Sequence, residues 1–197
     1  MPRKPLIRTD LYYYHITTRS NHKEWFSLPL SMVWQISTNS FLKALKENPV
    51  NIAQYVLMGN HYHLLVQTPN SDIDKFMYFF NKTFSMNLRK LSGQINRMFG
   101  SNYKWSVIYE RNYLQTVYRY IYQNPLRAGL VKECYNYPFS TLYYHHRNLQ
   151  PGFPVQRKIY YDVNEPSINT MLDSEDLNAI RTGLKKTIFK PNSKRRY

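Results

Sequence analysis

The order of apolar and polar residues along the chain predicts short strands that alternate with longer helices. Runs rich in aromatic and β-branched residues are typical of strands, and four of them occur, at 11–18, 52–58, 61–68 and 105–109. Longer segments that carry apolar residues at roughly helical spacing predict helices over 31–46, 71–93 and 112–124. The predicted order is therefore β-α-β-β-α-β followed by one more helix.

Turn and cap residues set the expected boundaries of these elements. Gly59 and Asn60 separate two predicted strands by two residues, which indicates a hairpin. Ser71 and Asp74 have the spacing of a helix N-terminal cap, and Gly93 is expected to end that helix. Pro125 is expected to stop the last helix. This pattern favours an α+β fold of the ferredoxin-like type, a four-stranded antiparallel sheet with helices on one face.

The C-terminal part of the chain has a weaker pattern. Residues 132–170 contain several prolines and read as loop, and one short helix is expected from Ser174 to about Lys186. The last residues, KPNSKRRY, are basic and expected to be flexible. We therefore expect one domain over 1–147 and a basic C-terminal extension over 148–197.

Composition narrows the class of protein. An apolar content of 43% with 16% aromatic residues excludes a disordered tail. The one cysteine, Cys134, allows no internal disulfide. No apolar run approaches the roughly 18 residues needed to cross a bilayer, and the first ten residues lack the apolar core of a signal peptide. We therefore expect a soluble, cytoplasmic protein with no membrane partner.

The charge balance points to a polyanionic partner. Lys and Arg number 27 against 12 Asp and Glu, which gives a formal charge of +15 and a pI near 9.8. Tyr, with 19 residues, outnumbers Phe, with 10, and a tyrosine ring can stack on an unpaired base. Nucleic acid is therefore the favoured partner, although a basic protein with an ordinary aromatic core would have the same composition.

His61 and His63 form the most informative short motif. Alternate residues of a strand share a face, so both imidazoles are expected to face outward from the sheet while Tyr62 faces the core. Two neighbouring imidazoles can bind a divalent metal ion. The same tripeptide also fits an ordinary polar face of a sheet.

Tyr120 and Asn124 lie one helical turn apart in the last predicted helix. An amide oxygen beside a phenol could complete a metal site next to a nucleophile. Alternatively, this is an amphipathic helix whose Asn124 caps its own end before Pro125.

Two segments together resemble a known family. MGNHYHLLVQTP at 58–69 and RYIYQNPLRAGLV at 119–131 look like the motifs of the HUH single-tyrosine transposases, and within them of the REP-associated tyrosine transposases. A family start of the form Tyr-His-x-Thr-x-Arg is matched by Tyr14, His15, Thr17 and Arg19. The resemblance covers about residues 1–147, and one departure is Gly59, where a proline is usual.

The resemblance implies an enzyme that cleaves and rejoins single-stranded DNA at hairpin-associated sites through a 5′-phosphotyrosine. Tyr120 matches the nucleophile, and His61, His63 and Asn124 match the metal ligands. Two imidazoles and one amide oxygen suit Mg²⁺ or Mn²⁺ better than a closed zinc site.

Basic residues are the candidates for contacts with DNA phosphates. Those we expect to take part are Arg19, Arg127, Arg119, Lys104 and Arg111, with Arg3, Lys4 and Arg8 as further candidates. Arg181, Lys185 and Lys186 of the C-terminal helix could add contacts or cover the site. Short relatives act as dimers and REP-associated ones can act as monomers, and we favour the monomer. The competing hypotheses are a non-catalytic nucleic-acid-binding protein on the same ferredoxin-like fold and a structural basic protein with a fortuitous motif.

Overall fold

The computed structural model describes residues 5–156 and 166–190. Arg3, Lys4 and the basic segment 191–197 lie outside the described residues. The strands are β1 (Tyr13–Arg19), β2 (Asn51–Leu57), β3 (His61–Gln67) and β4 (Lys104–Ile108). The helices are α1 (Leu30–Glu47), α2 (Ile73–Ser92), α3 (Arg111–Tyr122), α4 (Asn124–Arg127), α5 (Thr141–His146) and α6 (Ser174–Gly183). Short 3-10 turns occur at η1 (Asn21–Lys23), η2 (Cys134–Asn136) and η3 (Pro166–Asn169).

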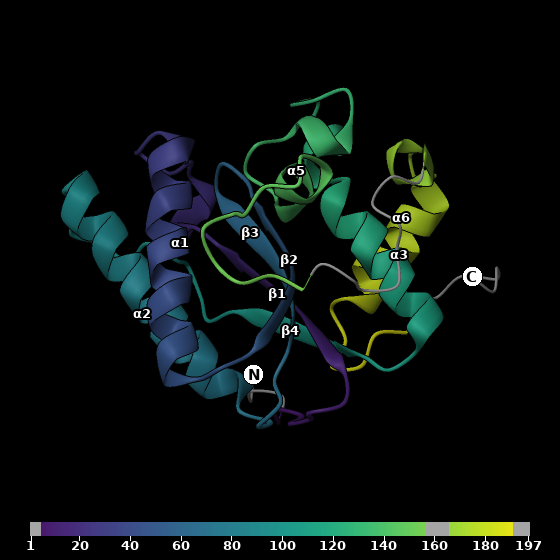
Figure 1. The fold of residues 1–197 in the computed structure, drawn as a ribbon, viewed down its shortest axis with the longest axis horizontal. Coiled ribbons are helices and arrows are strands. Elements are labelled where there is room, and N and C mark those ends of the chain that lie inside the picture. The colour runs from purple at the N-terminus through teal and green to yellow at the C-terminus, as the bar shows by residue number, and fades with distance from the viewer. Residues whose placement is uncertain (1–4, 157–165, 191–197) are drawn as a thin grey trace.

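The four strands form one antiparallel sheet in the order β2-β3-β1-β4. The first and third strands are central, and each helix of the β-α-β-β-α-β order connects two strands that are not neighbours (Figure 1). The sequence-based fold class, ferredoxin-like α+β, is confirmed. The register pairs Arg19 with His61 and Thr17 with His63, so the polar ends of β1 and β3 lie side by side.

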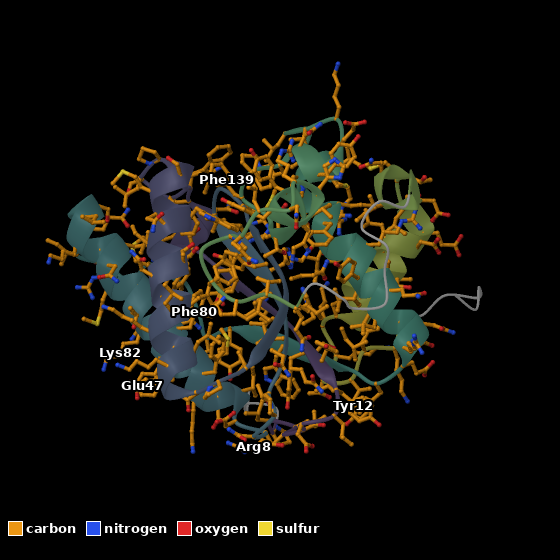
Figure 2. All side chains as sticks on the ribbon, viewed as in Figure 1. Arg8, Tyr12, Glu47, Phe80, Lys82 and Phe139 are labelled. Carbon is orange, nitrogen blue, oxygen red and sulfur yellow. The ribbon has the colours of Figure 1, made fainter. Side chains whose placement is uncertain are left out.

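Helices α1 and α2 cover one face of the sheet (Figure 1). Phe76, Phe80, Phe84 and Leu88 recur every four residues on α2 and are fully buried against the sheet and α1. Figure 2 shows Phe80 on this side of the sheet. Gly93 ends α2 with φ of 70°, a left-handed conformation that favours glycine, as the sequence predicted.

The opposite face of the sheet is covered as well, by α3, α5 and α6 (Figure 1). A second apolar core joins Leu65 of the sheet to Val117 and Ile121 of α3 and to Ile180 of α6. Residues 187–189 extend the sheet beside β4, because Val107 N–H donates to Thr187 O at 2.8 Å and Phe189 N–H donates to Val107 O at 2.8 Å. The expectation of helices on only one face is thus incomplete, and the C-terminal residues belong to this second layer.

Several predicted boundaries differ from the structure. Residues 132–170 are not all loop, because α5 begins after Ser140, whose side chain accepts a hydrogen bond from Tyr143 N–H. Pro125 does not stop the chain from being helical, because it occupies the first turn of α4, where a missing N–H costs little. Helix α2 begins at Ile73, and its N-cap residue, Asp72, makes no side-chain cap bond, so the predicted cap at Ser71 is wrong. Helix α6 ends at Gly183 rather than near Lys186.

A search for membrane-spanning helices gives a negative result. Within residues 5–156 and 166–190, no helix combines the length and apolarity needed to cross a bilayer.

The second core leads to a stability prediction. Ile180 of α6 is fully buried against α3, so Ile180→Ala should lower the free energy of unfolding by about 2–5 kcal/mol through lost burial and a residual cavity. Met171→Ala, at a side chain that is 52% exposed, should change it by less than about 0.5 kcal/mol. Urea denaturation followed by circular dichroism measures both. Equal, small effects would mean that α6 contributes nothing to the folded core.

Candidate functional site

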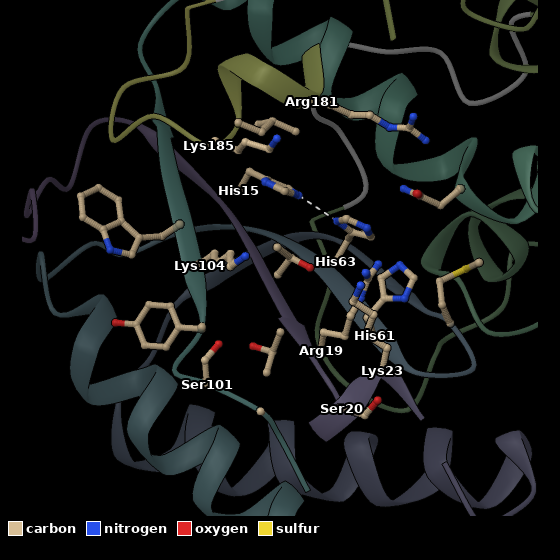
Figure 3. A pocket seen from close by; sticks show the side chains of 18 of the residues that line it. His15, Arg19, Ser20, Lys23, His61, His63, Ser101, Lys104, Arg181 and Lys185 are labelled. Carbon is tan, nitrogen blue, oxygen red and sulfur yellow. Dashed lines mark hydrogen bonds between the residues drawn. The ribbon is translucent and has the colours of Figure 1, made fainter. Parts of the chain in front are cut away.

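A large cavity lies on the second face of the sheet, bordered by β1, β3, α3, α4 and α6 (Figure 3). It encloses about 1500 Å³, and we call it the main cavity. The residues that carry its chemistry come from five parts of the chain and are His15, Arg19, His61, His63, Lys104, Tyr120, Asn124, Arg127, Arg181 and Lys185.

The floor of the main cavity is a polar stripe on the sheet. His15, Thr17 and Arg19 alternate along β1 and therefore share one face. On the neighbouring strand β3, His61 lies opposite Arg19 and His63 lies opposite Thr17. On the other side of β1, Lys104 of β4 lies opposite Thr17. The antiparallel register therefore gathers imidazole and cationic side chains that lie far apart in the sequence.

His61 presents one ring nitrogen to the cavity. Its Nδ1 lies 2.7 Å from Oδ1 of Asn60, which can only accept, so Nδ1 carries the proton and Nε2 keeps its lone pair. Burial, and then the positive charge of Arg19, lowers the pKa of His61 to about 4. His61 is therefore neutral near pH 7, which is the form that binds metal ions.

His63 is held by a histidine that the sequence analysis did not assign to the site. His15 Nε2 lies 2.9 Å from His63 Nδ1, and the two rings stack with centroids 5.2 Å apart (Figure 3). When His63 donates from Nδ1, its Nε2 lone pair is free for a ligand. The signal in the sequence was the period of two that places His15, Thr17 and Arg19 on the face shared with His63.

His63 is less accessible than expected. Its side chain is 6% exposed, because α3 lies over the face of the sheet that we expected to be open. Burial, followed by the neighbouring imidazoles, lowers the pKa of His63 well below its usual value, and burial lowers that of His15 to about 3. Tyr62, between the two histidines, is fully buried in the first core, as predicted.

Tyr120 reaches this polar stripe from α3. Its ring stands edge-on to His63 and to His15, with centroids 5.9 and 6.4 Å apart, and the residue is 7% exposed. Arg127 lies over the same ring, with Cζ 4.6 Å from the ring centroid, and its Nη2 donates to Tyr120 O at 2.9 Å. Tyr120 is thus in contact with two imidazoles and one guanidinium.

The other tyrosines of α3 have different surroundings. Tyr122 Oη bonds to Thr141 Oγ1 at 2.8 Å, and its ring contacts Tyr118, with centroids 4.9 Å apart, in the second core. Burial raises the pKa of Tyr122 to about 12 and that of Tyr118 well above its usual value. Tyr113 contacts Phe189. Among these four tyrosines, Tyr120 alone lines the main cavity.

Asn124 lies one turn beyond Tyr120 and also lines the main cavity. Its Nδ2 donates to the carbonyls of Tyr120 and Ile121 at 3.1 and 3.0 Å. The second of these carbonyls would normally accept from residue 125, which is a proline and has no N–H. Asn124 therefore does cap the helix. Because its Nδ2 is used in these two hydrogen bonds, the amide is oriented so that Oδ1 remains for a ligand.

These donors fit a divalent metal ion that binds mixed nitrogen and oxygen ligands. His61 uses Nδ1 in its bond to Asn60 and keeps Nε2 available, His63 does the same in the tautomer that donates from Nδ1 to His15, and Asn124 offers an amide oxygen. Within the described ranges, no group of three His, Cys, Asp or Glu residues comes together to bind a metal, and the further donor beside the two histidines is the amide of Asn124.

The basic residues singled out from the sequence divide into two groups. Arg19, Lys104 and Arg127 line the main cavity. Arg119 instead donates to Thr170 O, and Arg111 at the start of α3 does not line the cavity. DNA contacts by all five residues stay a prediction. Arg181 of α6 and Lys185, just after the end of α6, do reach the cavity wall (Figure 3).

Comparisons with known proteins show the family to which the chain belongs. The family described as "Transposase IS200 like" matches residues 8–124. The REP-associated tyrosine transposase of Escherichia coli strain K12 is 24% identical over 160 residues, which cover 78% of this chain and 87% of that protein. The solved structure of a REP-associated tyrosine transposase bound to a REP hairpin matches with a TM-score of 0.65 at 18% identity, over 81% of this chain and 95% of that chain, which shows a shared fold.

The family match spans more than half of the chain and contains the two histidines, Tyr120 and Asn124. The chain therefore belongs to the IS200-like transposase family, and it is a DNA transposase.

Proposed function

We propose that this transposase cleaves and rejoins single-stranded DNA at hairpin-associated sites, with Tyr120 as the nucleophile and a divalent metal ion as cofactor. The contact of the Tyr120 ring with His63, inside a cavity lined by cations, carries this proposal. The curated relative is a REP-associated tyrosine transposase, and the solved structure of such an enzyme contains a REP hairpin, which supports a hairpin as the DNA partner here.

The chemical step is a transesterification. The Tyr120 oxygen forms a bond to the scissile phosphorus, the bond from phosphorus to the 3′ oxygen breaks, and that oxygen takes up a proton. The products are a 5′-phosphotyrosine and a free 3′-hydroxyl. In the joining step, the 3′-hydroxyl of another strand attacks the phosphotyrosine and releases Tyr120. The energy of the phosphodiester is retained, so the reaction needs no nucleotide cofactor.

The main barrier within the protein is ionisation of the phenol. A tyrosine with a pKa of about 10 costs roughly 4 kcal/mol to ionise at pH 7. Arg127 lies over the Tyr120 ring, and although burial lowers the pKa of Arg127 to about 10, its guanidinium is still charged near pH 7. A positive charge this close attracts the scissile phosphate and offsets the negative charge that develops as the bond to phosphorus forms.

The metal ligands would be His61 Nε2, His63 Nε2 and Asn124 Oδ1. A bound Mg²⁺ or Mn²⁺ would polarise the oxygens of the scissile phosphate and offset their developing charge. Asn60 fixes the tautomer of His61, and His15 would accept from His63 Nδ1 so that His63 Nε2 faces the ion. Pro125 has no N–H, which leaves the Ile121 carbonyl to accept from Asn124 Nδ2 and so orients the amide.

The DNA strand would follow the cationic walls of the main cavity. Arg19 and Lys104 line the cavity from the sheet, and Arg181 of α6 and Lys185, just after α6, line it from the second layer. Because Tyr120 is already in contact with His63 and His15 of the same chain, a single copy can supply the whole site. This supports a monomer as the working unit, and family membership sets aside the non-catalytic alternative.

The nucleophile is tested by removing one oxygen atom. Tyr120→Phe keeps the ring that contacts His63, so the protein should still bind hairpin DNA while cleavage and the denaturation-resistant protein–DNA adduct are both lost. Tyr109→Phe is the matched control. Tyr109 does not line the main cavity and its ring contacts Tyr12, so this variant should behave as the wild type. Denaturing gels with labelled DNA measure cleavage and adduct. Wild-type cleavage by Tyr120→Phe without an adduct would mean that water is the nucleophile.

The metal site is tested by binding as well as by activity. His61→Ala removes a proposed ligand that is only partly buried, so the fold should persist while Mn²⁺ affinity falls by at least roughly tenfold. His146→Ala, at an exposed residue outside the main cavity, is the control. The loss of the free Mn²⁺ electron paramagnetic resonance signal on titration measures binding, and thermal melting checks the fold. Unchanged Mn²⁺ affinity in His61→Ala would contradict the ligand assignment.

A further inference from the structure

Trp25 is a large aromatic side chain that the catalytic proposal leaves unused. It follows η1 and is 76% exposed. An indole ring on a protein surface keeps a large apolar area in water, and such exposure is typical of binding sites. The other two tryptophans, Trp34 and Trp105, pack against the first core.

The indole is held in place by the turn that leads into His61. A Cβ atom on Gly59 would lie 3.3 Å from Cε3 of Trp25, so the ring packs directly on the backbone of the β2–β3 turn. Phe26 N–H donates to Gly59 O at 2.8 Å, and Asn60 Nδ2 donates to Lys23 O at 2.6 Å. Gly59, where the resembling pattern has proline, therefore leaves room for the ring two residues before a proposed metal ligand.

Trp25 forms part of a second cavity of about 190 Å³. Phe26 and Ile95 add apolar surface, and Gln94, Asn96 and Arg97 add hydrogen-bond donors. The volume is about six times that of one water molecule in the liquid, which is room for one planar base and too little for a base pair.

The second cavity adjoins the main cavity. Asn21 and His22 line both of them, so η1 is the wall that they share. Lys23 faces the main cavity and Arg97 faces the second, which places a cation on each side of this wall. A DNA strand that leaves the main cavity over η1 would keep its phosphates near positive charge.

We propose that the second cavity binds one unpaired nucleobase of the substrate strand, stacked on Trp25 and flanked by Arg97. This inference rests on the proposed function, because the strand reaches the second cavity from the main one. An indole face and a guanidinium plane are the groups that bind unpaired bases, and the amides of Gln94 and Asn96 can bond to the edge of the base. The site would thus help to select the sequence beside the hairpin.

The test compares DNA with and without unpaired residues. Trp25→Ala should weaken binding of a hairpin with single-stranded flanks roughly tenfold, as expected for one lost base stack, and leave binding of the same hairpin without flanks unchanged. Trp25→Phe, which keeps a smaller ring, should restore part of the affinity. Tyr78→Ala is the matched control, because Tyr78 is an exposed aromatic residue on α2 with Lys82 Nζ 5.5 Å from its ring centroid. Fluorescence anisotropy at one fixed salt concentration measures all four proteins.

Abasic substitutions then locate the base. One flank position should lose affinity in the wild type when its base is removed and lose nothing further in Trp25→Ala. Equal binding of flanked DNA by Trp25→Ala and wild type, an equal loss on the bare hairpin, or the absence of such a position would overturn the proposal. A change from dimer to monomer in Trp25→Ala would instead assign the indole to a contact between copies. An unpaired oligonucleotide without a hairpin is a further probe, because it offers unpaired bases even if the protein does not bind hairpins. Weaker binding of this oligonucleotide by Trp25→Ala than by the wild type would therefore support the base site independently of hairpin binding.

Discussion

The helix that carries Tyr120 is bonded to the sheet by a buried side chain of the sheet itself. The register of β2 shifts between Ile52 and Gln54, and this irregularity turns Gln54 toward the second face, where its Nε2 donates to Tyr118 O at 2.9 Å. The bond fixes α3 at the carbonyl two residues before Tyr120. Because the rest of the site lies on the sheet, the position of Tyr120 over His63 depends on this one attachment and on the apolar contacts around it.

Covering the second face has an electrostatic consequence. His15 and His63 of the polar stripe lie under α3 with little access to water, and burial disfavours the charged form of these two histidines and of His61, which leaves neutral imidazoles with lone pairs for ligands. The positive charge of the site is then supplied by Arg19, Lys104 and Arg127. A neutral donor set surrounded by cations suits a reaction in which both the substrate and the developing nucleophile are anions.

The features of the site that depend only on local backbone geometry were predicted from short sequence patterns. The period of two in 61–68 placed both histidines on one face, and the i, i+4 spacing aligned Tyr120 with Asn124. The bond from His15 to His63 could not be predicted in this way, because it depends on the register between two strands 48 residues apart. The packing of Ile180 on α3 is likewise set by contacts distant in sequence, and α5 is too short for its apolar spacing to be distinctive.

Mapping the protein–DNA adduct of the wild-type enzyme tests the central claim most directly. Trypsin cuts after Arg111, Arg119 and Arg127, which separates NYLQTVYR from YIYQNPLR and so separates Tyr113 and Tyr118 from Tyr120. After the DNA is trimmed by nuclease, mass spectrometry should find the nucleotide on the second peptide, and fragmentation should assign it to Tyr120. A nucleotide on Tyr118 or Tyr122, or on a peptide from outside α3, would contradict the site described for this enzyme.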